Sequence, residues 1–90
     1  METNTLDHQE FVNERMGNKS VLFLPGIGKK RGRKLELKDF DKAYLVLGQF
    51  LLLKKDHKRF TEWLKHTSGA NAREAGLCDW CLREWCVPFI

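Results

Sequence analysis

Hydrophobic residues recur along most of this chain at spacings of three and four, which is the pattern of amphipathic helices. Two sets show it best: Phe60, Trp63 and Leu64 in one segment, and Leu82, Trp85 and Phe89 near the C-terminus. Strand signals are weak, because β-branched residues are scarce and no alternating apolar run is bounded by turns. The pattern predicts an all-α fold, a compact bundle of five or six short helices in one domain over residues 1–90.

Polar residues and glycines indicate where the predicted helices begin and end. Candidate N-terminal caps, whose side-chain oxygens can accept a backbone hydrogen bond, are Asn4 or Thr5, Asp39 or Asp41, and Asp56. Predicted helix ends lie at residues 16–18, at about Lys38 and at Ser68-Gly69, and Pro88 is predicted to disturb the end of the last helix. A short turn over residues 20–24 separates the first helix from the second.

Residues 43–53 form the most apolar segment, interrupted only by Gly48 and Gln49. A helix that is apolar nearly all round cannot hide every face within so small a domain. The segment is too short to cross a bilayer, so we expect no direct membrane insertion. Its spare face is predicted to meet a second copy in a twofold dimer, with Gly48 allowing close approach despite a propensity cost of ~1 kcal/mol. The alternative is a monomer in which this helix is fully buried.

Charge is unevenly distributed along the chain. Residues 29–73 carry thirteen basic and five acidic residues, a net charge of +8, whereas the segments before and after them each carry a net charge of −2. Such asymmetry predicts a surface that meets an anion, and nucleic acid is the commonest partner of this kind. The alternative is a solvated lysine-rich surface.

The stretch Pro25-Gly26-Ile27-Gly28 is followed at once by five basic residues, Lys29, Lys30, Arg31, Arg33 and Lys34. Glycine tolerates positive φ and close approach of another backbone or a phosphate, and Ile27 is predicted to anchor the turn in the core. The first N–H groups of the following helix would point outward with the positive end of the helix dipole, which suits an anion. Over about residues 20–38 this pattern resembles the helix-hairpin-helix of DNA-binding proteins that ignore sequence. The alternative is a structural turn followed by an incidental basic helix.

Three cysteines, Cys78, Cys81 and Cys86, lie close together in the sequence. A structural zinc site takes four ligands, commonly as two separated pairs. Here a single CxxC pair is followed by one thiol, and His66 would have to complete the set, so we expect reduced thiols in the core or at an interface. No phosphate loop, paired-carboxylate cluster or nucleophile–base motif is recognisable. The sequence therefore predicts neither an enzyme nor a cofactor or metal.

Seven stretches together resemble the barrier-to-autointegration factor family over essentially the whole chain: HQEFV, MGNK, GIG, FDKAYLVLGQFLLLKKD, EWLK, GANA and CLREWC. The resemblance implies an all-helical homodimer that binds double-stranded DNA without sequence preference through two opposed helix-hairpin-helix sites. It also implies DNA bridging and chromatin compaction, nuclear assembly with LEM-domain membrane proteins and lamins, and a location in nucleus and cytoplasm at chromatin and the nuclear envelope.

The resemblance also assigns residues to these roles. DNA contacts fall on Gly26, Ile27, Gly28, Lys30, Arg31 and Lys34, with a second helix start at Asn71, Ala72 and Arg73. The dimer contact falls on Gly48, Leu52 and Trp63, and the candidates for phosphorylation that releases DNA are Thr3 and Thr5.

Several residues depart from the family pattern. Asp7 replaces a basic residue, while Lys30 and Arg31 replace apolar or neutral ones, so we expect a shifted DNA footprint with similar or higher affinity. Arg59 replaces an apolar residue beside the groove that receives LEM domains, and a charge in an apolar pocket is costly, so we expect weakened LEM binding. An alternative role is a divergent paralogue that forms heterodimers with a stronger DNA binder and regulates it. Trp80 beside the cysteines has no role that the sequence explains.

Overall fold

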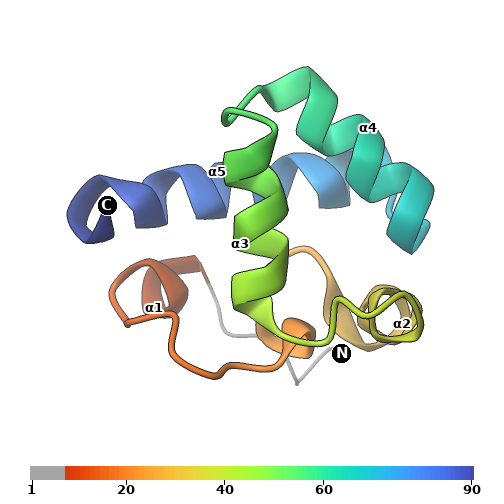
Figure 1. Cartoon of the computed structure of the whole chain (residues 1–90), viewed down its shortest axis with the longest axis horizontal. Coiled ribbons are helices and arrows are strands. Elements are labelled where there is room, and N and C mark those ends of the chain that lie inside the picture. The colour runs from red at the N-terminus through yellow and green to blue at the C-terminus, as the bar shows by residue number, and fades with distance from the viewer. Residues whose placement is uncertain (1–7) are drawn as a thin grey trace.

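The computed structural model describes residues 8–90 of the chain, and within them it is all-helical, as predicted (Figure 1). The elements in chain order are α1 (His8–Val12), the 3₁₀ turn η1 (Val21–Phe23), α2 (Gly28–Leu37), α3 (Ala43–Leu52), α4 (His57–Ser68) and α5 (Ala72–Phe89). The single β-type pairing in this part of the chain is an isolated bridge between Ser20 and Lys42.

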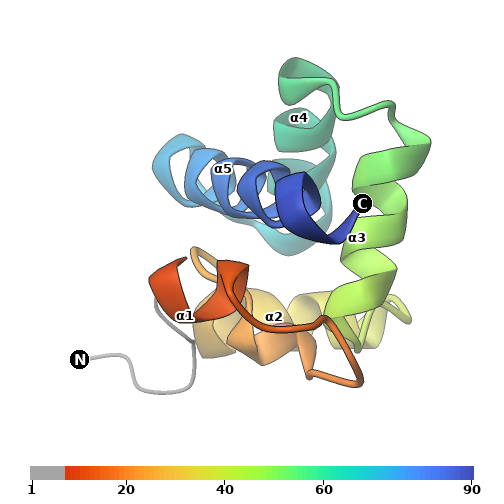
Figure 2. The same cartoon turned by 90° about the vertical axis from the view of Figure 1, so that its left-hand side faces the viewer.

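Helix α5 is the longest element and lies across the middle of the molecule (Figure 1). Helix α4 packs on one side of α5 and α1 on the other, while α3 crosses α5 and reaches η1 at its far end (Figures 1 and 2). Helix α2 contacts both η1 and α4. The turn before α2 is therefore held against the rest of the domain from two directions.

Apolar side chains from every element meet in one core. Its fully buried members include Phe11, Val21, Leu24, Leu35, Val46, Phe50, Phe60, Leu64 and Leu82. The predicted inward faces of α4 and α5 are thus confirmed at Phe60, Leu64 and Leu82. Two residues predicted to face inward are not fully buried. Trp63 is only partly buried, and Phe89 is exposed, although its ring stacks on that of Trp85.

Two of the predicted helix boundaries are confirmed at α4. The Asp56 carboxylate accepts a hydrogen bond of 2.9 Å from the backbone N–H of Arg59, and Gly69 ends the helix in the left-handed conformation, with φ of 79°. The predicted caps of α3 are wrong, because α3 follows Lys42 and no side chain caps it. The N–H of Ala43 instead donates to the Lys19 carbonyl at 2.9 Å, so a loop carbonyl far away in sequence replaces the cap.

The predicted ends of the first and last helices also need correction. Helix α1 stops at Val12 rather than at 16–18, and two turn-type hydrogen bonds then lead the chain to the buried Met16. Helix α5 continues past Pro88, and the N–H of Ile90 still donates to the Cys86 carbonyl at 2.9 Å. The cap candidates Asn4 and Thr5 lie outside the described residues.

Candidate nucleic-acid interface

The turn between η1 and α2 has the backbone that its glycines predict. Gly26 and Gly28 both have positive φ, 87° and 67°. A Cβ atom on Gly26 would lie 2.5 Å from the carbonyl oxygen of Glu74 and 3.2 Å from the amide nitrogen of Cys78. Only glycine therefore lets this turn sit against the backbone of α5, and the predicted close approach is that of a protein backbone.

Ile27 is the anchor of the turn, with 3% of its surface exposed, as predicted. It is also the N-cap residue of α2, and no side chain caps that helix. The first N–H groups of α2, from Gly28 onward, consequently have no capping side chain, and the positive end of the helix dipole lies with them. This is the arrangement of a helix start that can accept an anion.

A further glycine, Gly32, holds α2 against η1, and the sequence reasoning missed it. A Cβ on Gly32 would collide with the Leu22 side chain, so the missing side chain at Gly32 lets Leu22 pack directly on the backbone of α2. The signal was available, because a glycine inside a helix lowers helix propensity and usually marks close packing.

Most basic side chains of α2 are exposed, but Arg31 is an exception. Lys29, Lys30, Arg33 and Lys34 are exposed to solvent. Arg31 keeps 21% of its side-chain surface exposed, and its Nε donates to Glu74 Oε1 at 3.1 Å. Lys34 extends toward the loop before α5, since its Nζ lies 3.2 Å from the position that a Cβ on Gly69 would take.

The start of α5 is fixed by a capping box. The Asn71 side chain accepts from the Glu74 N–H at 2.8 Å, and Glu74 Oε1 accepts from the Asn71 N–H at 2.9 Å. The Asn71 backbone hydrogen bond lowers the pKa of Glu74 against an opposing effect of burial, and Arg31 lowers it further. The box leaves the N–H groups of Ala72 and Arg73 as the free donors of the first turn.

The structure thus brings together the two groups of DNA-contact candidates. Gly26 lies against the Glu74 backbone, Arg31 is paired with the Glu74 carboxylate, and Lys34 reaches Gly69. Two helix starts and exposed lysines consequently form one surface, which we call the hairpin surface: residues 26–34 and 71–74. Glu74 was missed from the sequence, although Asn71-x-x-Glu74 is a capping-box signature.

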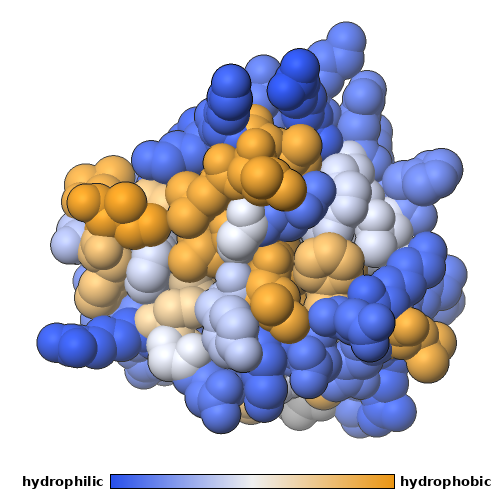
Figure 3. Space-filling model, viewed as in Figure 1, coloured by the Kyte–Doolittle hydropathy of each residue, from blue (hydrophilic) through white to orange (hydrophobic). Residues whose placement is uncertain are grey.

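A second surface is formed by α3, which is not fully buried within one chain. Its exposed residues Tyr44, Gly48, Leu51 and Leu52 recur at spacings of three and four, and we call them the α3 stripe. Leu52 is 72% exposed, and a Cβ on Gly48 would have no neighbour within 4 Å. Apolar side chains gather over α3 and over the C-terminal end of α5 (Figure 3). Trp63 lies in α4 instead, edge-on against Phe40 with ring centroids 5.0 Å apart.

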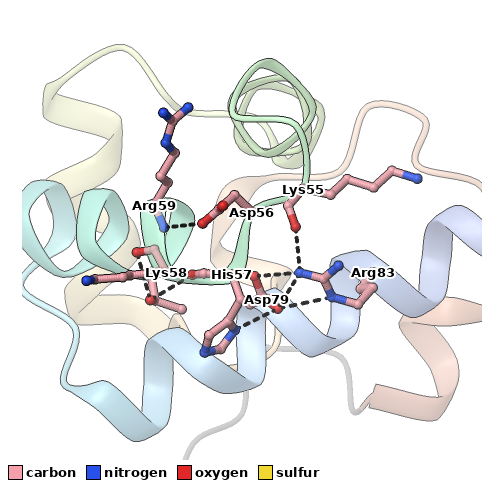
Figure 4. A network of polar contacts seen from close by, with 8 residues as sticks. Lys55, Asp56, His57, Lys58, Arg59, Asp79 and Arg83 are labelled. Atoms are coloured by element: carbon pink, nitrogen blue, oxygen red, sulfur yellow. Dashed lines mark hydrogen bonds and ion pairs between the residues drawn. The ribbon is translucent and has the colours of Figure 1, made fainter.

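The corner between α3 and α4 is held by a polar network around buried Asp79 (Figure 4). Asp79 Oδ1 lies 3.2 Å from both Arg83 Nη2 and His57 Nδ1, and Arg83 Nη2 also donates to the Lys55 carbonyl at 2.7 Å. These contacts fix a turn in which Lys55 has φ of 59°. The Arg59 side chain points away from the network and is exposed (Figure 4).

The three cysteines are buried and unpaired. Burial raises the pKa of Cys81 to about 12 and that of Cys78 well above its ordinary value. Over residues 8–90 no cluster of three or more histidine, cysteine or acidic side chains could hold a metal ion, so His66 does not join the cysteines. The burial of all three thiols agrees with the predicted core position.

Among the helices that the structure describes, none is long and apolar enough to cross a membrane. Thr3, Thr5 and Asp7 lie outside the described residues.

Comparison with known proteins identifies the family. The family model for barrier to autointegration factor matches residues 2–89. The chain is 56% identical to barrier-to-autointegration factor of Danio rerio over 90 residues, which is 100% of both chains. It is 57% identical to the Homo sapiens protein over 88 residues, covering 98% of this chain and 99% of that one. The Drosophila melanogaster protein is 48% identical over 83 residues, 92% of each chain. The chain therefore belongs to the barrier-to-autointegration factor family, a family of non-enzymatic DNA-binding proteins.

Proposed function

We propose that this protein binds double-stranded DNA without sequence preference through the hairpin surface. The observation that carries this proposal is the contact of Gly26 with the Glu74 backbone, which places two helix starts beside one another. The free N–H groups at the starts of α2 and α5 would bind phosphate oxygens, with Ile27 holding the turn in place. Contacts of this kind bind the DNA backbone and carry no sequence information.

The exposed lysines extend this site to neighbouring phosphates. Lys30 and Lys34 are exposed on α2, and Arg73 is exposed at the start of α5. Each basic residue that neutralises a phosphate releases a condensed cation, so affinity falls as salt rises, with a log–log slope of about −0.9 per phosphate. Arg31 takes a different part, because its pairing with Glu74 keeps that carboxylate from repelling the phosphates.

We further propose that two copies associate through the α3 stripe into a homodimer that bridges DNA. An exposed apolar row with an open glycine suits a twofold contact, because the same row exists on each copy. The stripe consists of α3 residues, whereas the hairpin surface consists of residues 26–34 and 71–74, so association through the stripe would use different residues from DNA binding. A dimer would then carry two DNA sites and compact chromatin by joining separate duplexes.

The proposed cellular role is in chromatin and nuclear envelope assembly, in nucleus and cytoplasm, with lamins and LEM-domain proteins as partners. Exposed Arg59 at the α3–α4 corner supports weaker LEM binding than an apolar residue would give. Phosphorylation of Thr3 or Thr5 would add negative charge at the N-terminus and oppose DNA binding.

A second candidate role is a heterodimerising regulator of a stronger DNA-binding paralogue. Glu74 favours it, because this carboxylate lies within the hairpin surface and occupies Arg31. This role predicts weak duplex binding by the protein alone and formation of mixed dimers when the two paralogues are combined.

Charge reversal tests the assignment of the hairpin surface. The variant carrying both Lys30→Glu and Lys34→Glu should lose duplex affinity by about tenfold or more, measured by fluorescence anisotropy. Its matched control carries Lys54→Glu and Lys58→Glu, which change the net charge equally at the exposed α3–α4 corner. Equal losses in the two variants would mean that binding follows net charge alone, and the assignment would fail.

A further inference from the structure

Trp80 forms a stacked pair with His8 on the outer side of α5. The two ring centroids are 3.7 Å apart and the ring planes differ by 15°. Glu84 fixes both rings: its Oε1 lies 2.8 Å from His8 Nε2, and its Oε2 accepts from Trp80 Nε1 at 3.1 Å. We call this pair the His8–Trp80 platform.

The platform presents an aromatic face to solvent. Trp80 is 48% exposed even though His8 covers one face of its indole. The exposed part is therefore the side that His8 does not cover. Because the hydrogen bond to Glu84 and the stack already restrict the indole, a ligand would find it ordered before binding, which lowers the entropy cost of association.

The platform adjoins the hairpin surface along α5. Trp80 follows Arg73 by seven residues, so both lie on the same side of the helix, two turns or about 10 Å apart. Between them, Leu77 Cβ lies 3.3 Å from the position that a Cβ on Gly26 would take. Trp80 would therefore lie next to DNA that is bound at the hairpin surface, whether the duplex ends there or extends past it.

The chemistry of the platform suits a nucleobase better than a phosphate. Hydrogen bonding by His8 lowers the pKa of Glu84, so a carboxylate stands directly beside the stack and repels phosphate. An exposed aromatic face binds bases by stacking, and any base has such a face. Bases inside a duplex are already stacked on one another, so only an unpaired base is free to use the platform.

We propose that the His8–Trp80 platform binds an unpaired nucleobase next to the duplex held by the hairpin surface. The proposal rests on the DNA binding proposed above. It makes the protein a reader of duplex ends and of junctions between double and single strands, in addition to a binder of continuous duplex.

The test compares three fluorescent probes that share one duplex: a blunt end, an overhang of about four nucleotides, and an overhang of the same length with abasic sugars. The abasic probe carries the same phosphates as the normal overhang and lacks only the bases. Wild-type protein should bind the normal overhang about tenfold more tightly than the abasic one. Trp80→Ala should remove this difference and retain blunt-duplex binding, whereas Trp80→Phe should keep most of it.

Equal affinity of the wild-type protein for the normal and abasic overhangs would overturn the inference, and so would a difference that persists in Trp80→Ala. If Trp80→Ala fails to fold, equal affinity of the wild type for the two overhangs still overturns the inference. Blunt-duplex binding separates the two proposals, because its absence in the wild type would contradict the proposed function, whereas its presence without an overhang preference contradicts the platform alone.

Discussion

Arg31 and Glu74 are 43 residues apart in the chain and form an ion pair in which Arg31 Nε lies 3.1 Å from Glu74 Oε1. The same Glu74 oxygen accepts the backbone hydrogen bond from Asn71. One carboxylate thus completes the cap of α5 and connects that helix to α2. The geometry of the hairpin surface depends on this contact as well as on the glycines of the turn.

Replacing Gly26 should destabilise the fold. In Gly26→Ala the new Cβ would meet the Glu74 carbonyl at 2.5 Å, and the residue would have to keep a φ of 87°. Overpacking and the left-handed conformation together should cost about 2–4 kcal/mol of unfolding free energy. The measurement is denaturant unfolding followed by circular dichroism.

Gly76→Ala is the matched control for this variant. Gly76 is a helical glycine of α5 whose added Cβ would meet nothing within 4 Å. The substitution should therefore raise stability by up to about 1 kcal/mol, since alanine favours a helix over glycine. If Gly26→Ala proves as stable as Gly76→Ala, the close packing of the turn on α5 is wrong.

Glu74 should make stability depend on pH in the acidic range. Its pKa is lower in the folded protein than the ordinary value of 4.5, chiefly because of the Asn71 backbone hydrogen bond. Its stabilising contribution is therefore complete above that value and is lost as the pH falls through the folded-state pKa. Glu74→Gln should lose less stability between pH 6 and pH 3 than the wild type, as measured by thermal unfolding. Glu62→Gln, at an exposed site on α4, should keep the wild-type loss.

Arg31 and Lys34 should respond differently to truncation. Lys34→Ala removes an exposed charge, so the log–log salt slope of duplex binding should become shallower by about 0.9 with the melting temperature unchanged. Arg31→Ala leaves Glu74 unpaired, so it should lower the melting temperature as well as DNA affinity. Anisotropy titrations and thermal melts of both variants check this, and identical behaviour of the two would refute separate roles.

Leu52→Glu should prevent formation of the proposed dimer and leave the protein monomeric. It places a charge in the α3 stripe, where burying an unpaired charge is costly. Sedimentation velocity should show one chain per particle, and duplex binding should persist while bridging of two duplexes is lost. Leu37→Glu is the control, since Leu37 is 84% exposed at the end of α2, outside the stripe. A dimer that survives Leu52→Glu would exclude the stripe as the contact.

The cysteines should be unreactive in the folded protein. Burial raises the pKa of Cys81 to about 12, and only the thiolate is a good nucleophile. Ellman's reagent at pH 8 should therefore modify the native protein far more slowly than the denatured protein. Rapid modification of three thiols in the native state would contradict the buried positions.

Local sequence patterns could predict much of this fold. Apolar spacing places Phe60 and Leu64 in the core because a helix repeats its faces every three to four residues. The Gly26-Ile27-Gly28 turn was likewise predictable, since positive φ and a buried anchor leave a clear residue pattern. Asp56 capped α4 as predicted, because a cap acts within one turn.

The features that escaped prediction depend on contacts between distant segments. Helix α3 begins where Ala43 finds the Lys19 carbonyl, which no local cap signal reveals. The pairing of Arg31 with Glu74 needs the turn at Gly26 to lie against α5, so the sequence alone could not separate Arg31 from the exposed lysines. Trp80 acquires its role only once α1 folds back and brings His8 onto it.

The hairpin surface is proposed to bind DNA through the phosphates of the duplex. Its most direct test is fluorescence anisotropy with two unrelated duplexes of equal length at several salt concentrations. Phosphate binding by the hairpin surface predicts equal affinities for the two sequences and a steep fall in affinity with salt, with a slope of about −0.9 for each phosphate neutralised. Weak binding that hardly changes with salt would contradict it, and so would a clear preference for one sequence.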